Sequence, residues 1–162
     1  MGNIVIKKAT KKQILPISIL TKKHSSVMLY RTPEAVKKLL GNYFIALMGE
    51  EVVGCCGFKT YPGGDAEIIS LAVEKKYRKL GIGGKLIKKV IREALKRNSV
   101  KRIMAFTNPH VTPLFRKNGF VQVGVQLFHE KILEECRKCP RNRLDKNNKY
   151  HCNESAMVYT GK

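Results

Sequence analysis

The sequence has no long hydrophobic run in its 162 residues. A helix that spans a membrane needs about 20 consecutive apolar residues, and no stretch approaches that length. The first fifteen residues contain four lysines and no long apolar run follows them, so we expect neither a secretory signal nor a membrane partner. These absences predict a cytoplasmic protein.

Acidic residues are scarce. The chain has 12 Asp and Glu against 32 Lys and Arg, which gives a net charge of +20. Such a charge favours anionic partners such as phosphates, nucleic acid or acidic lipid headgroups, without choosing among them. Because the basic residues are spread over almost every segment, the sequence favours a solvated, highly charged surface over a dedicated nucleic-acid face.

Cysteine is limited to five residues at mixed spacings. In a chain without a secretory signal, this pattern argues against a secreted scaffold held by disulfides. The length and the 43% content of hydrophobic residues suit one domain with a substantial core. We therefore predict a single domain over residues 1–162, with a basic, cysteine-containing segment at 129–153 inside it.

Hydrophobic patterns predict an alternation of strands and helices. Thr32 before Pro33 indicates a helix start, Gly41 indicates its end, and Gly49-Glu50 indicates a hairpin, whereas Pro16 is expected to interrupt a helix. The predicted strands are 3–9, 43–48, 52–59, 66–73, 102–106, 120–127 and 155–160, and the predicted helices are 10–22, one from 33, one from 81, and 111–118. This order predicts an α+β fold with helices around one mixed, mostly antiparallel sheet.

Glycines join the strand at 66–73 to the long helix. Gly81 and Gly83 follow Arg78, and Lys79 and Lys85 add positive charge nearby. Glycine lets a phosphate approach the backbone, and the unpaired amides of a first helical turn donate to its oxygens. The segment has neither the Gly-Lys-Ser/Thr ending of a nucleotide P-loop nor the Gly-x-Gly-x-x-Gly spacing of a dinucleotide fold. It predicts a pyrophosphate site, with a plain strand-to-helix turn as the alternative.

The pattern Arg78-x-x-Gly81-x-Gly83 resembles the acyl-CoA pyrophosphate motif of the GNAT superfamily of N-acyltransferases. Asn108 and the segment 114–120 resemble the later motif of that superfamily, and the order of elements matches it from residue 3 to residue 127. Within the superfamily, the segments 31–34, 54–57, 66–73 and 106–107 look most like the acetyltransferase domain of N-acetylglutamate synthases. The resemblance implies a GNAT-like acyltransferase fold that uses acetyl-CoA as co-substrate.

The resemblance also assigns residues to the co-substrate. In the superfamily, the strand before the turn splays from its neighbour and its backbone pairs with the pantetheine arm, which here falls on Leu71, Ala72 and Val73. Asn108 matches a residue that contacts the pantetheine, and Phe115 lies where the superfamily packs the thiol end. The pyrophosphate falls on the turn, which comprises Arg78, Lys79, Leu80, Gly81, Ile82, Gly83, Gly84 and Lys85.

Transfer from a thioester to an amine needs a group that accepts the ammonium proton. Glu67 is the candidate catalytic base, because it lies in the strand that leads to the acyl site; the alternative is an ion pair with a lysine. A backbone N–H around Ala72 or Val73 would polarise the carbonyl. Many superfamily members have a tyrosine as general acid where this chain has Phe115, which cannot donate a proton, so the proton would come from water, Tyr77, Tyr43 or a cysteine.

The charge also bears on the acceptor. A protein at +20 repels polybasic peptides and attracts amino acids that carry carboxylates, so an amino acid such as glutamate is the predicted small-molecule acceptor. Arg31 could bind its carboxylate bidentately, and the alternative is a surface arginine beside a helix cap. The alternative functions are a protein or peptide N-acetyltransferase and a non-catalytic module that binds CoA or nucleic acid. A homodimer is also left open.

The cysteines form two groups. Cys136, Cys139 and Cys152 could bind one zinc ion, with His151 or His129 as a further ligand; a redox-active dithiol and plain structural cysteines are the alternatives. Cys55 and Cys56 suggest a covalent acyl-enzyme, but no histidine lies at a spacing that implicates a partner. We expect those two to be small buried apolar residues.

Overall fold

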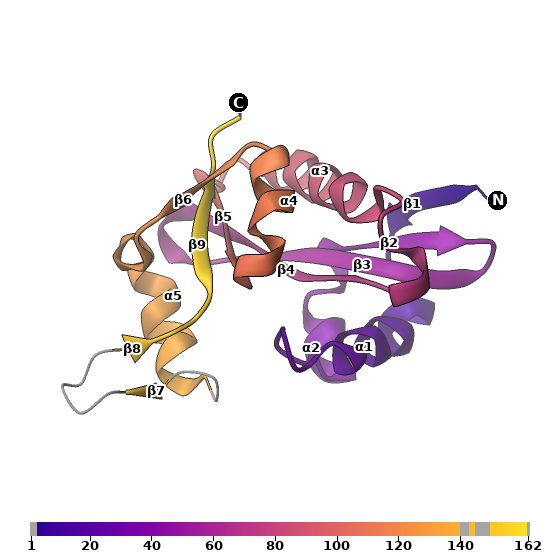
Figure 1. Cartoon of the computed structure of the whole chain (residues 1–162), viewed down its shortest axis with the longest axis horizontal. Coiled ribbons are helices and arrows are strands. Elements are labelled where there is room, and N and C mark those ends of the chain that lie inside the picture. Colours follow the sequence, from indigo (N-terminus) through magenta and orange to yellow (C-terminus); the bar gives the residue numbers. More distant parts are fainter. Residues whose placement is uncertain (1–2, 140–142, 145–149, 162) are drawn as a thin grey trace.

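Seven strands form one mixed sheet in the computed structural model, which describes residues 3–139, 143–144 and 150–161. The strands lie in the order β1-β2-β3-β4-β5-β9-β6, and neighbours are antiparallel except β4 and β5, which are parallel (Figure 1). The bounds are β1 Ile4–Lys8, β2 Tyr43–Met48, β3 Glu51–Thr60, β4 Asp65–Val73, β5 Arg102–Thr107, β6 Phe120–Val123 and β9 Ser155–Tyr159. The predicted α+β fold with a mostly antiparallel sheet is confirmed.

Helices cover both faces of this sheet (Figure 1). One face carries α3 Ile82–Leu95 and α4 Thr112–Lys117, and the other carries α1 Ile14–Lys23, α2 Pro33–Lys38 and α5 His129–Glu134. Alternation along β2 separates the two layers of the core: Tyr43 and Ile45 pack with Ile17 of α1, whereas Phe44 and Ala46 pack with the buried side of α3. The apolar period of α3 is confirmed, since its buried residues are Ile82, Leu86, Ile87, Val90, Ile91 and Ala94.

Several helix and strand ends differ from the predicted ones. Pro16 does not interrupt α1, because it lies in the first turn, where a backbone N–H has no partner inside the helix. The helix capped by Thr32 ends at Lys38, before Gly41, and a single 3₁₀ turn follows at Leu40–Asn42. The strand predicted over 120–127 ends at Val123, and a 3₁₀ turn at Val125–Leu127 leads toward α5.

The segment 129–153 contains elements that its composition did not predict. It begins with α5, continues through a 3₁₀ turn at Cys136–Lys138, and includes a small hairpin of β7 Arg143–Leu144 and β8 Tyr150–His151. The chain then enters β9, which lies between β5 and β6. In the part of the chain that the structure describes, no helix has the length and apolar character needed to cross a membrane.

Candidate active site

The sheet opens between β4 and β5. These parallel strands pair only from Asp65 with Arg102 to Ile68 with Ala105. Beyond that point β4 stays paired with β3, while Phe106 and Thr107 of β5 stay paired with β9. The two strands therefore diverge at Ile68, as expected for the strand that precedes the glycine turn.

A bulge marks the point of divergence in β4. Ser70 and Leu71 stand opposite the single residue Cys56 of β3, and Ser70 has φ 56°, a left-handed conformation that is uncommon outside glycine. Two buried contacts hold it: the hydroxyl of Tyr43 lies 2.9 Å from that of Ser70, and the Cys55 thiol donates to the Ser70 carbonyl at 3.3 Å. The bulge changes the direction of the backbone at the residues that follow it, Leu71, Ala72 and Val73.

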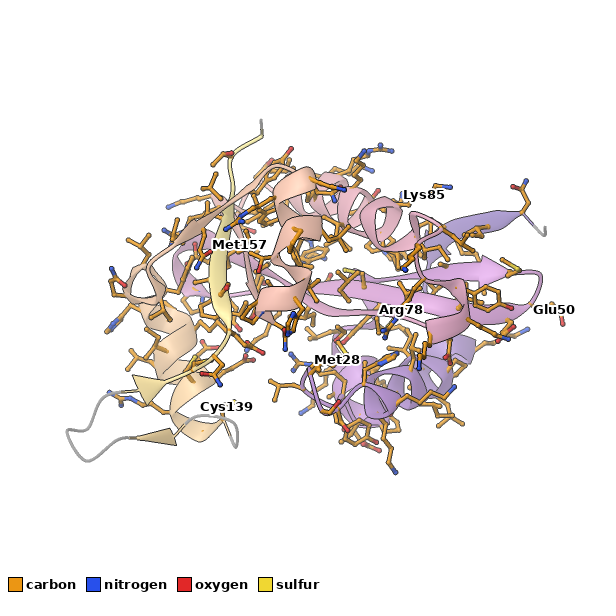
Figure 2. The ribbon with its side chains drawn as sticks, in the orientation of Figure 1. Met28, Glu50, Arg78, Lys85, Cys139 and Met157 are labelled. Atoms are coloured by element: carbon orange, nitrogen blue, oxygen red, sulfur yellow. The ribbon has the colours of Figure 1, made fainter. Side chains whose placement is uncertain are left out.

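A cleft of about 740 Å³ occupies the space between the splayed strands. It is lined from both faces of the sheet, since α3 and α4 contribute on one side and the loop after α1 together with α5 on the other. The cleft brings together most of the predicted site residues: Arg31, Glu67, Leu71, Ala72, Val73, Arg78, Lys79, Gly81, Ile82, Gly83, Gly84, Asn108 and Phe115. Leu80 and Lys85 do not line it. Leu80 is 41% exposed, and Lys85 projects outward from the start of α3 (Figure 2).

The turn before α3 presents free backbone amides. Gly81 is the N-cap and has φ 75°, a conformation that favours glycine, and no side chain in the described part of the chain caps the helix. The amides of the first turn therefore have no partner inside the helix, and the dipole of the helix makes this end positive. Arg78 donates from Nε to the Val73 carbonyl at 3.2 Å and so lies against the end of β4. This arrangement fits a pyrophosphate.

The other predicted contacts of the co-substrate come from β5 and α4. A Cβ on Gly83 would lie 3.0 Å from Leu114 Cδ2, so glycine at this position lets α4 approach α3 closely. Asn108 begins the 3₁₀ turn that precedes α4, and its side chain accepts a hydrogen bond from the backbone N–H of His110 at 3.0 Å. Phe115 is buried edge-on against Phe120, with the ring centroids 5.1 Å apart.

Glu67 lies at the end of the cleft nearest α5. The residue is 4% exposed, and its carboxylate accepts two hydrogen bonds on Oε2, from the Tyr61 hydroxyl at 2.6 Å and from Lys131 Nζ at 2.7 Å. Lys131 also donates to Glu135 Oε2 at 3.0 Å. Burial lowers the pKa of the Lys131 ammonium, but the carboxylates of Glu67 and Glu135 outweigh it and raise that pKa above its ordinary value. Glu67 is thus both paired with a lysine and in contact with the cleft.

Arg31 lines the cleft just before α2. Its Nε atom is buried and has no hydrogen-bond partner among the described residues. The same holds for Nε2 of His24, a further lining residue whose pKa is lowered by burial and by the charge of Arg78. A buried donor without a partner costs free energy, which a bound ligand can recover. An anionic group in this part of the cleft would satisfy such a donor.

The cysteines have no direct part in the cleft. Cys55 and Cys56 are fully buried, and burial raises the pKa of both thiols, that of Cys55 to about 12. Cys139 lies at the end of the molecule that carries α5, well apart from Arg78 (Figure 2). Over residues 3–139, 143–144 and 150–161, no three His, Cys, Asp or Glu side chains form a group that could hold a metal ion, so the zinc site predicted at Cys136, Cys139 and Cys152 lacks support there.

Sequence reasoning missed three kinds of lining residue. Ser70 carried no signal, because its left-handed backbone depends on the bulge between two strands. His24 belongs to a loop whose path the sequence does not indicate. Lys131 and Glu154 lie in or next to the segment 129–153, where one lysine among 32 basic residues could not be distinguished from the surface charge.

Comparisons with known proteins identify the family of this chain. The model of the acetyltransferase (GNAT) family matches residues 18–120. A curated relative, described as an uncharacterized N-acetyltransferase from Chlorobaculum tepidum, is 31% identical over 134 residues, which cover 83% of this chain and 80% of the relative.

Two solved structures share the fold over nearly the whole chain. N-acetylglutamate synthase from Neisseria gonorrhoeae, complexed with coenzyme A and N-acetyl-glutamate, has a TM-score of 0.80 at 20% identity over 98% of this chain, which spans only 35% of that protein. Rv2747 from Mycobacterium tuberculosis, in complex with CoA, has a TM-score of 0.75 at 18% identity and covers 96% of this chain and 98% of its own. The family match and the curated relative together show that the chain belongs to the acetyltransferase (GNAT) family and is an acetyl-CoA-dependent N-acetyltransferase.

Proposed function

We propose that this enzyme acetylates the amine of a free amino acid such as glutamate, by direct attack on acetyl-CoA in a ternary complex. The observation that carries the proposal is that Arg31, Glu67 and the glycine turn at 78–84 line one continuous cleft. A carboxylate group, an ammonium group and a pyrophosphate would each meet a suitable partner there. The solved N-acetylglutamate synthase contains N-acetyl-glutamate beside coenzyme A, which supports an amino acid in the same fold.

The co-substrate would lie along β4. The first-turn amides of α3 and the charge of Arg78 would hold the pyrophosphate, and the backbone of residues 71–73, which has no strand partner on the cleft side, would pair with the pantetheine arm. Asn108 and Phe115 face the same cleft. A backbone N–H near Ala72 or Val73 would polarise the thioester carbonyl.

Glu67 would act as the base. The ammonium of the acceptor gives a proton to the Glu67 carboxylate, and the free amine nitrogen attacks the carbonyl carbon to form a tetrahedral intermediate. The bond between carbon and sulfur then breaks with CoA leaving as a thiolate, and the nitrogen gives its second proton through water to that thiolate, which leaves a neutral amide and the CoA thiol. Tyr43 is fully buried and Tyr77 donates to Glu51 at 3.0 Å, so water is the better source of a proton for the thiolate. The buried, protonated thiols of Cys55 and Cys56 do not line the cleft, which favours direct attack over a covalent acyl-enzyme.

Arg31 would select the acceptor. Its guanidinium can bind a carboxylate bidentately, and its buried Nε gives such a ligand a donor that lacks a partner among the described residues. A zwitterionic amino acid could then present its ammonium to Glu67 and its carboxylate to Arg31. Cytoplasmic residence and a homodimer stay predictions, as does the single-domain extent of 1–162.

An acceptor screen tests the proposal. Purified protein is mixed with acetyl-CoA and each free amino acid, or with a polybasic peptide, and release of the CoA thiol is followed against a sample without acceptor. We expect release with glutamate or a related amino acid, and a loss of about 10²-fold or more in kcat for Glu67→Gln at unchanged CoA affinity. Release with the peptide alone would identify a peptide N-acetyltransferase, and acetyl-CoA binding without any release would contradict the proposed reaction.

A further inference from the structure

Helix α5 brings a buried lysine to the base. The Lys131 side chain is 7% exposed, and its Nζ lies 2.7 Å from Glu67 Oε2. The same ammonium lies 3.0 Å from Glu135 Oε2 and 4.9 Å from the centroid of the Phe106 ring. Both Lys131 and Glu67 line the cleft.

A lysine at this depth needs an explanation. Lysine is almost never fully buried unless it is paired, and a buried ion pair is weak evidence for stability, because the loss of hydration can exceed the attraction. Lys131 contacts two carboxylates, whereas hydrophobic residues of similar volume could fill the same space. Its position beside a residue of the cleft, Glu67, points to a role in the site.

The contacts restrain the Glu67 carboxylate. Lys131 of α5 and Tyr61, the residue after β3, both donate to Oε2. Two donors on one oxygen fix the rotation of the carboxyl group and leave Oε1 to accept a proton from the acceptor.

We propose that Lys131 is a positioning residue that fixes the orientation of the Glu67 carboxylate for proton transfer from the acceptor. This inference rests on the proposed role of Glu67 as the base. It gives the segment 129–153 a function: α5 brings a cation to the acceptor end of the cleft, and Glu154, which precedes β9, lines the same cleft.

Other titratable groups surround the pair, and the test must separate their effects. They come from β3 and the residue after it, from α5 with the turn after it, and from the residue before β9, and they are Lys59, Tyr61, Glu134, Glu135, Cys136 and Glu154. Lys59 is the matched control, because its Nζ lies 2.7 Å from Glu135 Oε1 in the same network but the residue does not line the cleft.

The first test is a double-mutant cycle on acetyl transfer, with Lys131→Met, Glu67→Gln, the double variant and Lys59→Met. We expect Lys131→Met to lower kcat by about 10²-fold, as for a misplaced catalytic group, with the KM for acetyl-CoA unchanged. The double variant should lose no more than Glu67→Gln alone, because Lys131 acts through Glu67. Lys59→Met should keep kcat within about threefold. Losses that multiply in the double variant, or equal losses for both lysine variants, would overturn the proposal.

The second test needs no turnover. Crystal structures of the wild type, Lys131→Met and Lys59→Met compare the orientation of the Glu67 carboxylate. We expect this carboxylate to rotate or to take several orientations in Lys131→Met, because one of its two donors is gone, and to keep the wild-type orientation in Lys59→Met. A single, unchanged orientation in Lys131→Met would refute the inference. If the wild type releases no CoA with any amino acid, the proposed function fails, while these structures still decide whether Lys131 positions Glu67.

Discussion

The hydroxyl of Tyr43 lies 2.9 Å from the hydroxyl of Ser70, two strands away in the sheet. The ring of Tyr43 reaches across β3 at Gly57, where an added Cβ would lie 2.9 Å from Tyr43 Cδ1. A side chain at position 57 would clash with the Tyr43 ring, so this position requires glycine. The hydroxyl on that ring in turn contacts Ser70, whose backbone is left-handed. This contact links the core under α1 to the bulge that opens the cleft.

Removing the Tyr43 hydroxyl should loosen the bulge. Burial raises the pKa of Tyr43 to about 12, so the group is protonated near neutral pH and can donate to Ser70. We expect Tyr43→Phe to cost about 1 kcal/mol of unfolding free energy and to lower kcat, because the backbone of residues 70–73 is less restrained. Chemical denaturation and steady-state kinetics measure the two effects. Tyr159→Phe, whose ring packs against Phe120 outside the cleft, is the control, and an equal fall in kcat for both variants would contradict the role of the bulge.

The turn before α3 should be sensitive to a side chain at Gly81. Its φ of 75° costs an L-residue about 1–2 kcal/mol, and the turn would move to relieve this strain. We expect Gly81→Ala to weaken CoA binding by about 5- to 30-fold in calorimetric titration. Gly41→Ala is the control, because an added Cβ at Gly41 meets nothing within 4 Å and this glycine has no positive φ. Equal CoA affinity in the two variants would show that the turn does not bind the pyrophosphate.

Local sequence signals predicted most of the helices and strands outside the segment 129–153, and the glycine turn that lines the cleft. The apolar period after Gly81 and the N-cap at Thr32, which accepts a hydrogen bond from the Ala35 amide, depend on neighbours within a few residues. The sequence also indicates glycines that a turn requires, such as Gly81 before α3. These signals sufficed for the order of the strands along the chain and for the turn at 78–84.

The part of the cleft around Glu67 and Ser70 depends on contacts between distant segments, which no local pattern records. Lys131 meets Glu67 across 64 positions, and Tyr43 meets Ser70 across 27. The insertion of β9 between β5 and β6 places α5 beside the cleft, and nothing in the residues of 155–159 indicates their neighbours in the sheet. Sequence reasoning therefore found Glu67 and Arg31 but neither the partner of the base nor the bulge.

Arg31 should control the affinity for the acceptor. We expect Arg31→Met to raise the KM for the amino acid by about 10- to 100-fold, because a charge-assisted hydrogen bond to a carboxylate is worth about 1.5–3 kcal/mol. The KM for acetyl-CoA should stay unchanged, because the proposed contact of Arg31 is with the acceptor and not with the co-substrate. Arg97→Met is a control for lost positive charge outside the cleft, although thermal melting must show that it stays folded. A rise in both KM values for Arg31→Met would contradict a specific acceptor contact.

The thiols should differ in reactivity. Cys152 is exposed, whereas burial raises the pKa of Cys136 to about 11 and keeps Cys55 and Cys56 inaccessible. We expect iodoacetamide at pH 8 to alkylate Cys152 first and to reach Cys55 and Cys56 only after unfolding. Peptide mass spectrometry over time measures this order. Alkylation of Cys55 in the folded protein would show that this thiol is accessible and would favour a covalent acyl-enzyme again.

The ion pairs of Glu135 with Lys131 and Lys59 should make the stability of the folded protein depend on pH. Burial acts to raise the pKa of Glu135, but the charge of Lys131 and the hydrogen bonds from Lys59 and Lys131 outweigh it and lower the pKa to about 2. A carboxylate with a lowered pKa in the folded state adds stability above its unfolded pKa of about 4.3, and that contribution is lost as the pH falls toward 2. The Tm of the wild type should therefore exceed that of Glu135→Gln at pH 6, and the difference should shrink between pH 4.5 and pH 2.5.

Glu134→Gln is the matched control for this titration. Glu134 lies 3.3 Å from Lys59 and its side chain is 39% exposed, so its ion pair should contribute little at any pH. Thermal melts of the three proteins from pH 2.5 to pH 7 give the comparison. If the difference between the wild type and Glu135→Gln is constant over this range, the stabilisation comes from packing of the side chain and not from its charge, because only an ionised group loses its contribution on protonation.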